Sequence, residues 1–161
     1  PQNVPVSLAL GKNMDHQQKI LLAKFFETLQ ELRAVGIVRS DVILGDIGEF
    51  LCTVVFHGLK QVSEKTNMGY DALYNEKKVQ IKFSNSKDAK NLDLGNPSEY
   101  DELIVVLGSE SAHRMKNDED SDYLFYRFES KEVMDKFKVA SGYKLSKTKH
   151  FKKAEKSYSL S

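Results

Sequence analysis

Residues 69–84, GYDALYNEKKVQIKFS, constrain the fold of this chain more than any other stretch. They read as two short strands joined by a polar turn at residues 75–78. Side chains two residues apart on a strand lie on the same face. Gln80, Lys82 and Ser84 therefore share one face of the second strand, and the residues between them face the core. An amide and a lysine held side by side in mid-strand indicate an active site.

Hydrophobic periodicity predicts the other elements of the chain. A helix is expected over residues 14–35, with Asn13 or Asp15 as its N-cap and Gly36 at its end. A second helix, residues 41–57, is expected to start at Ser40 and to stop at Gly58. The remaining expectations are a loop over 84–97, a buried strand over 103–107, a helical turn over 109–116, an acidic loop over 117–122, a strand over 123–128 and a helix over 130–138.

Two glycines inside the second predicted helix, Gly45 and Gly48, each weaken a helix by about 1 kcal/mol relative to alanine. Their presence predicts close approach of this helix to a sheet or a ligand. The order of elements predicts an α/β (α+β) fold with a mixed central β-sheet flanked by helices. At 161 residues the chain is expected to form one domain. We expect an irregular arm over residues 1–13, the domain over 14–140 and a basic C-terminal tail over 141–161.

Composition narrows the function classes. The net charge is +1, so no overall field indicates a nucleic-acid partner. The single cysteine, Cys52, excludes an internal disulfide and any multi-cysteine zinc site, and suits a reducing, cytoplasmic location. Its place in an apolar helix predicts a buried thiol rather than a nucleophile. No apolar run reaches the roughly 18 residues of a membrane span, and no signal peptide is expected at the start of the chain.

The polar residues of the hairpin fit metal-assisted cleavage of a phosphodiester. Such cleavage at neutral pH uses a divalent cation, and Mg²⁺ prefers hard oxygen ligands. Asp71 offers a carboxylate, Gln80 an amide oxygen and Ile81 a backbone carbonyl beside it. Lys82 is placed to orient a water or to stabilise charge on the phosphate. Glu49, on the glycine-containing helix, offers a second carboxylate.

A helix glutamate, an aspartate on one strand and an acid-x-lysine on the next form a known pattern. Here it stands as Glu49, Asp71, Gln80 and Lys82, and it resembles the PD-(D/E)XK nuclease superfamily over roughly residues 40–107. The segments GDIGEF, GYDAL and VQIKFS also look like an uncharacterised bacterial and phage family of restriction-endonuclease-like domains. This resemblance implies a restriction-endonuclease-like core and Mg²⁺-dependent (or Mn²⁺-dependent) hydrolysis of DNA. It further implies that Asp71, Gln80, Ile81 and Glu49 hold the metal and that Lys82 acts on the nucleophile.

Gln80 departs from the superfamily pattern, in which an acid is usual at this position. Mrr-type restriction nucleases resemble this sequence in having glutamine there. A neutral ligand still lacks the formal charge that strengthens cation binding. The alternative is therefore a catalytically inactive module of the same fold that binds nucleic acid or protein.

Lysines near the end of the chain, interleaved with His150 and Phe151, suit contacts with backbone phosphates. A solvated end is the competing interpretation. The residues predicted to bind nucleic acid are Lys87, Lys90, Lys147, Lys149, Lys152 and Lys153. DNA is the expected partner, while RNA as substrate and a homodimer stay open alternatives.

Overall fold

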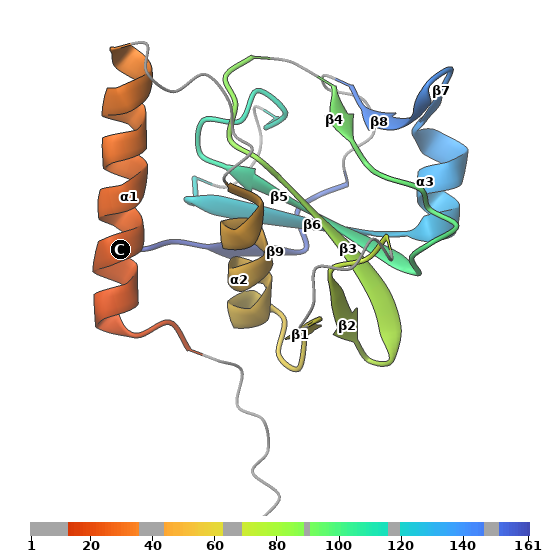
Figure 1. The fold of residues 1–161 in the computed structure, drawn as a ribbon, viewed down its shortest axis with the longest axis horizontal. Coiled ribbons are helices and arrows are strands. Elements are labelled where there is room, and N and C mark those ends of the chain that lie inside the picture. Colours follow the sequence, from red (N-terminus) through yellow and green to blue (C-terminus); the bar gives the residue numbers. More distant parts are fainter. Residues whose placement is uncertain (1–12, 36–43, 63–68, 89–90, 116–119, 147–151) are drawn as a thin grey trace, which may run out of the picture.

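Two sheets and three helices make up the residues that the computed structural model describes, which are 13–35, 44–62, 69–88, 91–115, 120–146 and 152–161. Figure 1 shows their arrangement. The helices are α1 His16–Ala34, α2 Gly45–Val55 and α3 Ser130–Lys136. The strands are β1 Lys60–Gln61, β2 Ala72–Tyr74, β3 Lys77–Ser84, β4 Leu92–Asp93, β5 Glu102–Gly108, β6 Tyr123–Glu129, β7 Lys138–Val139, β8 Gly142–Leu145 and β9 Lys156–Tyr158. None of the described helices is long and apolar enough to cross a membrane.

The larger sheet is mixed, as predicted, and has the strand order β1-β2-β3-β5-β6-β9. Strands β3 and β5 run parallel from the pair Val79–Glu102 to the pair Ser84–Leu107, and the other neighbours are antiparallel. All seven residues of β5 are buried. The continuous apolar run therefore forms a central strand that is covered on both faces.

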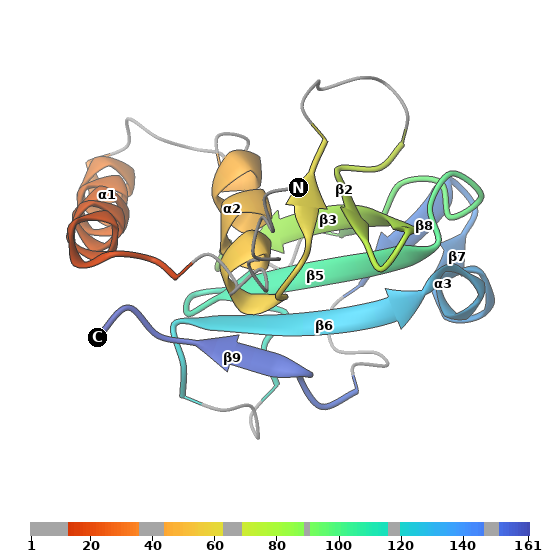
Figure 2. The same cartoon turned by 90° about the horizontal axis from the view of Figure 1, so that it is seen from below.

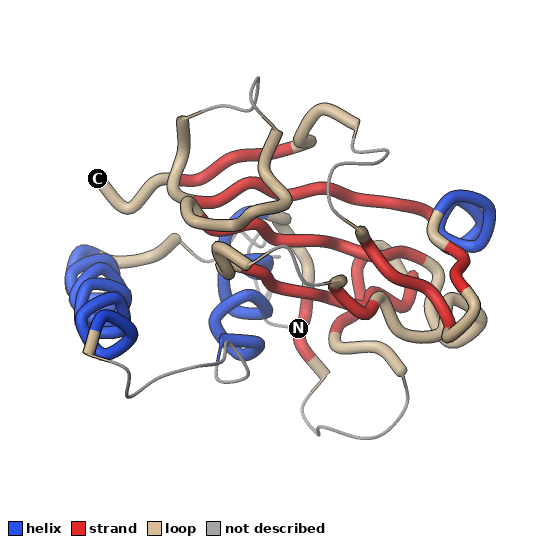
Figure 3. Tube along the Cα trace, turned by 90° about the horizontal axis from the view of Figure 1, so that it is seen from above, coloured by secondary structure: helices blue, strands red, loops and turns tan. Residues whose placement is uncertain are grey.

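The two faces of this sheet carry separate cores. Leu51 and Cys52 of α2 pack with Ile81, Ile104 and Phe125 on one face. The opposite face is covered by α3 and the small sheet β4-β8-β7, and its core joins Leu103, Val105, Phe128, Val133 and Leu145. Figure 2 shows α2 across the first face, and Figure 3 shows the small sheet on the second. Alternation along β5 divides its side chains between the two cores.

Gly48 explains how closely α2 approaches the sheet. A Cβ at this position would lie 2.9 Å from the Cβ of Phe83 on β3, too close for any side chain to fit without movement. At Gly45, the first residue of α2, an added Cβ would meet no atom within 4 Å beyond its chain neighbours and the backbone of its own helix. The prediction of close helix–sheet contact is confirmed for Gly48 and not for Gly45.

The helix limits differ modestly from the predicted ones. Helix α1 begins after Asp15, whose side chain accepts from the Gln18 N–H at 2.8 Å in a capping box. Helix α2 covers residues 45–55 instead of 41–57, and the predicted cap Ser40 lies outside the described residues. Helix α3 covers residues 130–136 instead of 130–138, with Glu129 as its N-cap.

Two other predicted segments also differ, the helical turn over 109–116 and the loop over 84–97. The stretch 109–116 forms turns rather than a helix in its described part, because the guanidinium of Arg114 binds the carbonyls of Leu107, Gly108 and Asp122 and draws the chain back to the sheet. The loop over 84–97 contains strand β4.

Two stretches of the expected basic tail are strands of the folded domain. Residues 142–145 form β8, between β4 and β7. Residues 156–158 form β9 and pair with β6, with Tyr123 opposite Tyr158. This pairing satisfies the backbone groups of β6 that would otherwise form a sheet edge. Of the expected N-terminal arm, only Asn13 lies among the described residues.

We predict that Gly48→Ala lowers the free energy of unfolding by about 1–3 kcal/mol, because the added methyl forces α2 and Phe83 apart. Gly45→Ala is the matched control and is expected to be neutral or to stabilise by up to about 1 kcal/mol. Urea unfolding followed by circular dichroism measures both. Equal effects of the two substitutions would contradict this packing.

Candidate functional site

The β2–β3 hairpin fixes which residues meet. Its turn consists of Asn75 and Glu76, with φ of 49° and 63°. Two successive left-handed residues are typical of a type I′ turn, whose twist matches that of the flanking strands. The turn sets Tyr74 opposite Lys77 and therefore Ala72 opposite Val79. The polar turn predicted over residues 75–78 is thus a two-residue turn, and the segment before β2 comes level with Gln80 and Ile81.

Asp71 directly precedes β2, at the point where the pairing of β2 with β3 ends. Its N–H donates to the carbonyl of Val79 at 2.8 Å, although the residue opposite Val79 is Ala72. This one-residue offset is that of a β-bulge, which re-aims a side chain beside a strand end. The carbonyl of Asp71 accepts from the N–H of Val62 at 3.0 Å, so its backbone is held from both sides.

The carboxylate of Asp71 binds the edge of β3 beyond the end of β2. Its Oδ2 accepts from the Ile81 N–H at 2.8 Å and from Nε2 of Gln80 at 2.6 Å. Nε2 of Gln80 also lies 3.4 Å from the carbonyl oxygen of Ile81. The Gln80 side chain is buried, with 9% exposure. Three of the predicted site residues are therefore in direct contact.

Glu49 approaches this group from α2. Its Oε2 accepts from Nε2 of Gln61 at 3.3 Å, and Gln61 stands opposite Ala72, the residue after Asp71. Burial raises the pKa of the Cys52 thiol above its usual range, and the negative charges of Glu49 and Asp71 raise it further. Both carboxylates thus lie within electrostatic reach of one buried thiol, one helical turn from Glu49. The prediction that Cys52 is buried is confirmed.

Lys82 lies next to the group without bonding to it. It is half-buried and stands opposite Val105 of β5. Because Ile81 faces α2, Lys82 leaves β3 on the Gln80 face, away from the helix that carries Glu49. Within the described part of the chain, Lys82 has neither a hydrogen-bond nor an ion-pair partner. The structure brings Asp71, Gln80 and Ile81 together. Glu49 and Lys82 do not converge with each other, because Glu49 approaches from the α2 face of the sheet and Lys82 leaves β3 on the opposite face.

Two residues near the site, Lys78 and Glu99, were not predicted to belong to it. The ammonium of Lys78 lies 5.4 Å from the centroid of the Tyr70 ring. The period of two along β3 places Lys78 on the Gln80 face, and this signal was available in the sequence. Gly69, with φ of 77°, lies against the side chain of Glu99, which leaves no room for a Cβ there.

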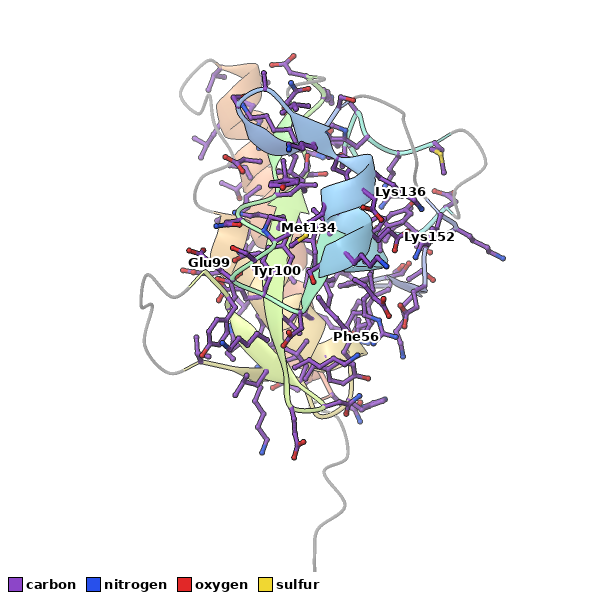
Figure 4. The ribbon with its side chains drawn as sticks, turned by 90° about the vertical axis from the view of Figure 1, so that its right-hand side faces the viewer. Phe56, Glu99, Tyr100, Met134, Lys136 and Lys152 are labelled. Carbon is purple, nitrogen blue, oxygen red and sulfur yellow. The ribbon has the colours of Figure 1, made fainter. Side chains whose placement is uncertain are left out.

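Of the predicted nucleic-acid-binding lysines, those that the structure describes do not gather around Asp71. Lys87 is exposed and pairs with Glu110 at 3.1 Å, and Lys153 is exposed. Lys152 pairs with Glu132 at 2.6 Å, and its ammonium lies over the ring of Phe128. Figure 4 shows Lys152 beside α3, on the side of the molecule away from Glu99. Lys90, Lys147 and Lys149 lie outside the described residues.

The chemistry of the donor set suits a small hard cation. Asp71 supplies a carboxylate oxygen and Ile81 a carbonyl oxygen, both in contact with one atom of Gln80. Rotation of the Gln80 amide would present a third oxygen to the same place. Two of these three donors, the amide oxygen and the backbone carbonyl, are neutral. The described residues contain no group of three or more His, Cys, Asp or Glu that could hold a metal.

No protein family matches the sequence, and no curated protein is significantly similar to it.

We predict that Asp71→Ala destabilises the metal-free protein by about 2–4 kcal/mol, because it leaves the Ile81 N–H and the Gln80 amide without their acceptor. Asp88→Ala removes an exposed carboxylate just after β3 and is expected to change stability by less than about 0.5 kcal/mol. Urea unfolding in the presence of a chelator measures both. Equal effects would show that the carboxylate of Asp71 does not hold the strand edge.

We also predict that the Cys52 thiol reacts with an aromatic disulfide reagent at least about 100-fold more slowly in the folded protein than in urea. The thiol is fully buried, and its raised pKa keeps it protonated. Because the chain has a single cysteine, the measured reaction with the reagent reports on the Cys52 thiol alone. Similar rates in the folded and unfolded states would contradict the buried position beneath the carboxylates.

Proposed function

We propose that this protein is a Mg²⁺-dependent endonuclease, also active with Mn²⁺, that hydrolyses phosphodiester bonds in DNA on a restriction-endonuclease-like core. The observation that carries the proposal is the contact of Asp71, Gln80 and the Ile81 carbonyl at one edge of β3. The order of elements also supports it, since α2 precedes an antiparallel hairpin whose second strand runs parallel to β5.

The residues present fit a magnesium ion. Asp71 Oδ2, the Ile81 carbonyl and the amide oxygen of Gln80 would hold it, and Glu49 would assist from α2. The bound cation neutralises charge that develops on the phosphate and lowers the pKa of an attacking water. The protein's own part is to keep the donor groups in place. The bulge at Asp71 fixes its carboxylate before any ligand arrives, and burial holds the Gln80 side chain beside it, with its NH₂ end toward Asp71.

Lys82 acts on the reacting groups in this proposal. Its ammonium has no competing carboxylate among the described residues, and it leaves β3 on the same face as Gln80. There it orients the attacking water or stabilises negative charge on the scissile phosphate. Tyr70 and Lys78, on the same side of the hairpin, are placed to contact the neighbouring nucleotide through stacking and charge.

DNA binding is proposed to draw on the predicted lysines as well. Lys87 follows the end of β3, whereas Lys152 and Lys153 precede β9, three strands from β3. Across the sheet this is about 14 Å, at about 4.8 Å per strand. The two groups also lie toward opposite ends of the strands, because Phe128, which Lys152 covers, is level with Gln80, so they would contact separate parts of a DNA duplex. We place the activity in the cytoplasm, where the Cys52 thiol stays reduced, and cutting of both strands would need two copies of the chain.

One observation favours a second function. The Gln80 amide already satisfies Asp71 and Ile81 without any cation. The alternative is therefore an inactive module of the same fold that binds nucleic acid or protein. A ligand that binds only the folded form raises the unfolding temperature, so a rise with Mg²⁺ supports the nuclease and no rise supports the module.

We predict that the protein cleaves plasmid or single-stranded DNA in the presence of Mg²⁺ or Mn²⁺, and that Lys82→Ala and Asp71→Ala each lower the rate at least about 100-fold. Lys24→Ala, an exposed lysine of α1, is the matched control and is expected to retain full activity. Gel electrophoresis of time courses measures the rates. Each variant is purified identically.

Equal cleavage by all four proteins would identify a contaminating nuclease and contradict the proposal. Loss of cleavage in Lys82→Ala with an unchanged unfolding temperature would assign the effect to chemistry rather than to folding.

A further inference from the structure

The Gln80 amide lies between two groups that can only accept hydrogen bonds. Its nitrogen is 2.6 Å from Oδ2 of Asp71 and 3.4 Å from the carbonyl oxygen of Ile81. A carboxylate and a backbone carbonyl carry no proton to donate. The NH₂ end of the amide must therefore face both of them whenever no cation is present, and this assignment follows from chemistry alone.

A divalent cation at the same place requires the opposite arrangement. Mg²⁺ binds oxygen, and the NH₂ end of an amide cannot coordinate it. The two ends of the glutamine amide exchange by a half turn about the last side-chain torsion, which is soft and roughly two-fold. The side chain of Gln80 thus has two arrangements with almost the same shape and opposite polarity.

We propose that the NH₂ end of the Gln80 amide occupies the metal site when no metal is bound. The amide then rotates by a half turn when a divalent cation binds. With its NH₂ end inward, it takes the place of the positive charge between Asp71 and Ile81. The strand edge is then fully hydrogen-bonded before metal arrives, and the cation must displace two contacts to enter. This inference rests on the proposed function, because it concerns the same site.

The device explains what glutamine does at this position. A glutamate would offer a formal charge to the cation, but without metal it would set two carboxylates against each other and lose both donated hydrogen bonds. Glutamine has the opposite effect. It favours an ordered site in the absence of metal and lowers the affinity of the site for the cation. The site is therefore expected to respond to cation concentration rather than to hold metal permanently.

The first test uses Gln80→Glu, with Gln30→Glu on exposed α1 as a control of equal charge change. In chelator, Gln80→Glu is expected to lower the unfolding temperature by about 3–10 °C, and Gln30→Glu by less than about 2 °C. The Mg²⁺ concentration that gives half of the maximal stabilisation is expected to fall at least about 10-fold in Gln80→Glu only. An unfolding temperature unchanged in chelator, or unchanged Mg²⁺ affinity, would overturn the inference.

The second test observes the wild-type amide directly and does not depend on the variant being folded. In ¹⁵N-labelled protein without metal, the side-chain NH₂ of Gln80 is expected to give two separated proton signals, and these protons are expected to exchange slowly with water. Saturating Mg²⁺ is expected to move both toward the position of a solvated glutamine amide and to speed exchange. The Ile81 backbone amide reports binding independently, because its N–H also contacts Asp71.

The outcomes separate the two ideas. If Mg²⁺ shifts the Ile81 signal while the Gln80 amide protons keep their positions, this inference is wrong and the proposed metal site stands. If Mg²⁺ shifts neither signal, the proposed function fails and the inference fails with it. Shifts of both, with faster exchange of the amide protons, support both.

Discussion

The difference in length between two neighbouring strands underlies the rest of this structure. Strand β3 has eight residues and its antiparallel partner β2 has three, so no strand of the described residues pairs with β3 beyond Val79 on that edge. Buried backbone N–H and C=O groups need partners. Side chains meet this requirement at Ile81, whose N–H binds Asp71 and whose carbonyl faces the Gln80 amide. A polar cluster in mid-sheet is the consequence.

The contacts that hold this strand edge are those that would bind metal in the proposed function, and their strengths explain why they persist without a ligand. A hydrogen bond to a carboxylate contributes about 1.5–3 kcal/mol, and an unsatisfied buried group costs a similar amount. Asp71 accepts two such bonds, so its position is fixed by the fold. Lys82 is not tied down in this way, and among the residues here its part in the site depends most on a substrate that would bring a phosphate to it.

The sequence predicted those features that follow from local periodicity. The period of two along residues 79–84 assigned the faces of β3 correctly, and the apolar run at 103–107 predicted the buried strand β5. Gly48 indicated the close contact of α2. Pairings between distant residues were not predictable, because no local pattern encodes them. Strand β9 has only three residues in a lysine-rich stretch, and the bulge that aims Asp71 at Ile81 depends on the register of the whole hairpin.

A manganese soak of crystals tests most directly whether this edge of β3 is a metal site. We expect one anomalous difference peak in contact with Oδ2 of Asp71 and the carbonyl oxygen of Ile81, together with a Gln80 amide whose oxygen faces the peak. Crystals soaked in millimolar Mn²⁺ that show no peak there, and an amide still bonded through its nitrogen to Asp71, would contradict it.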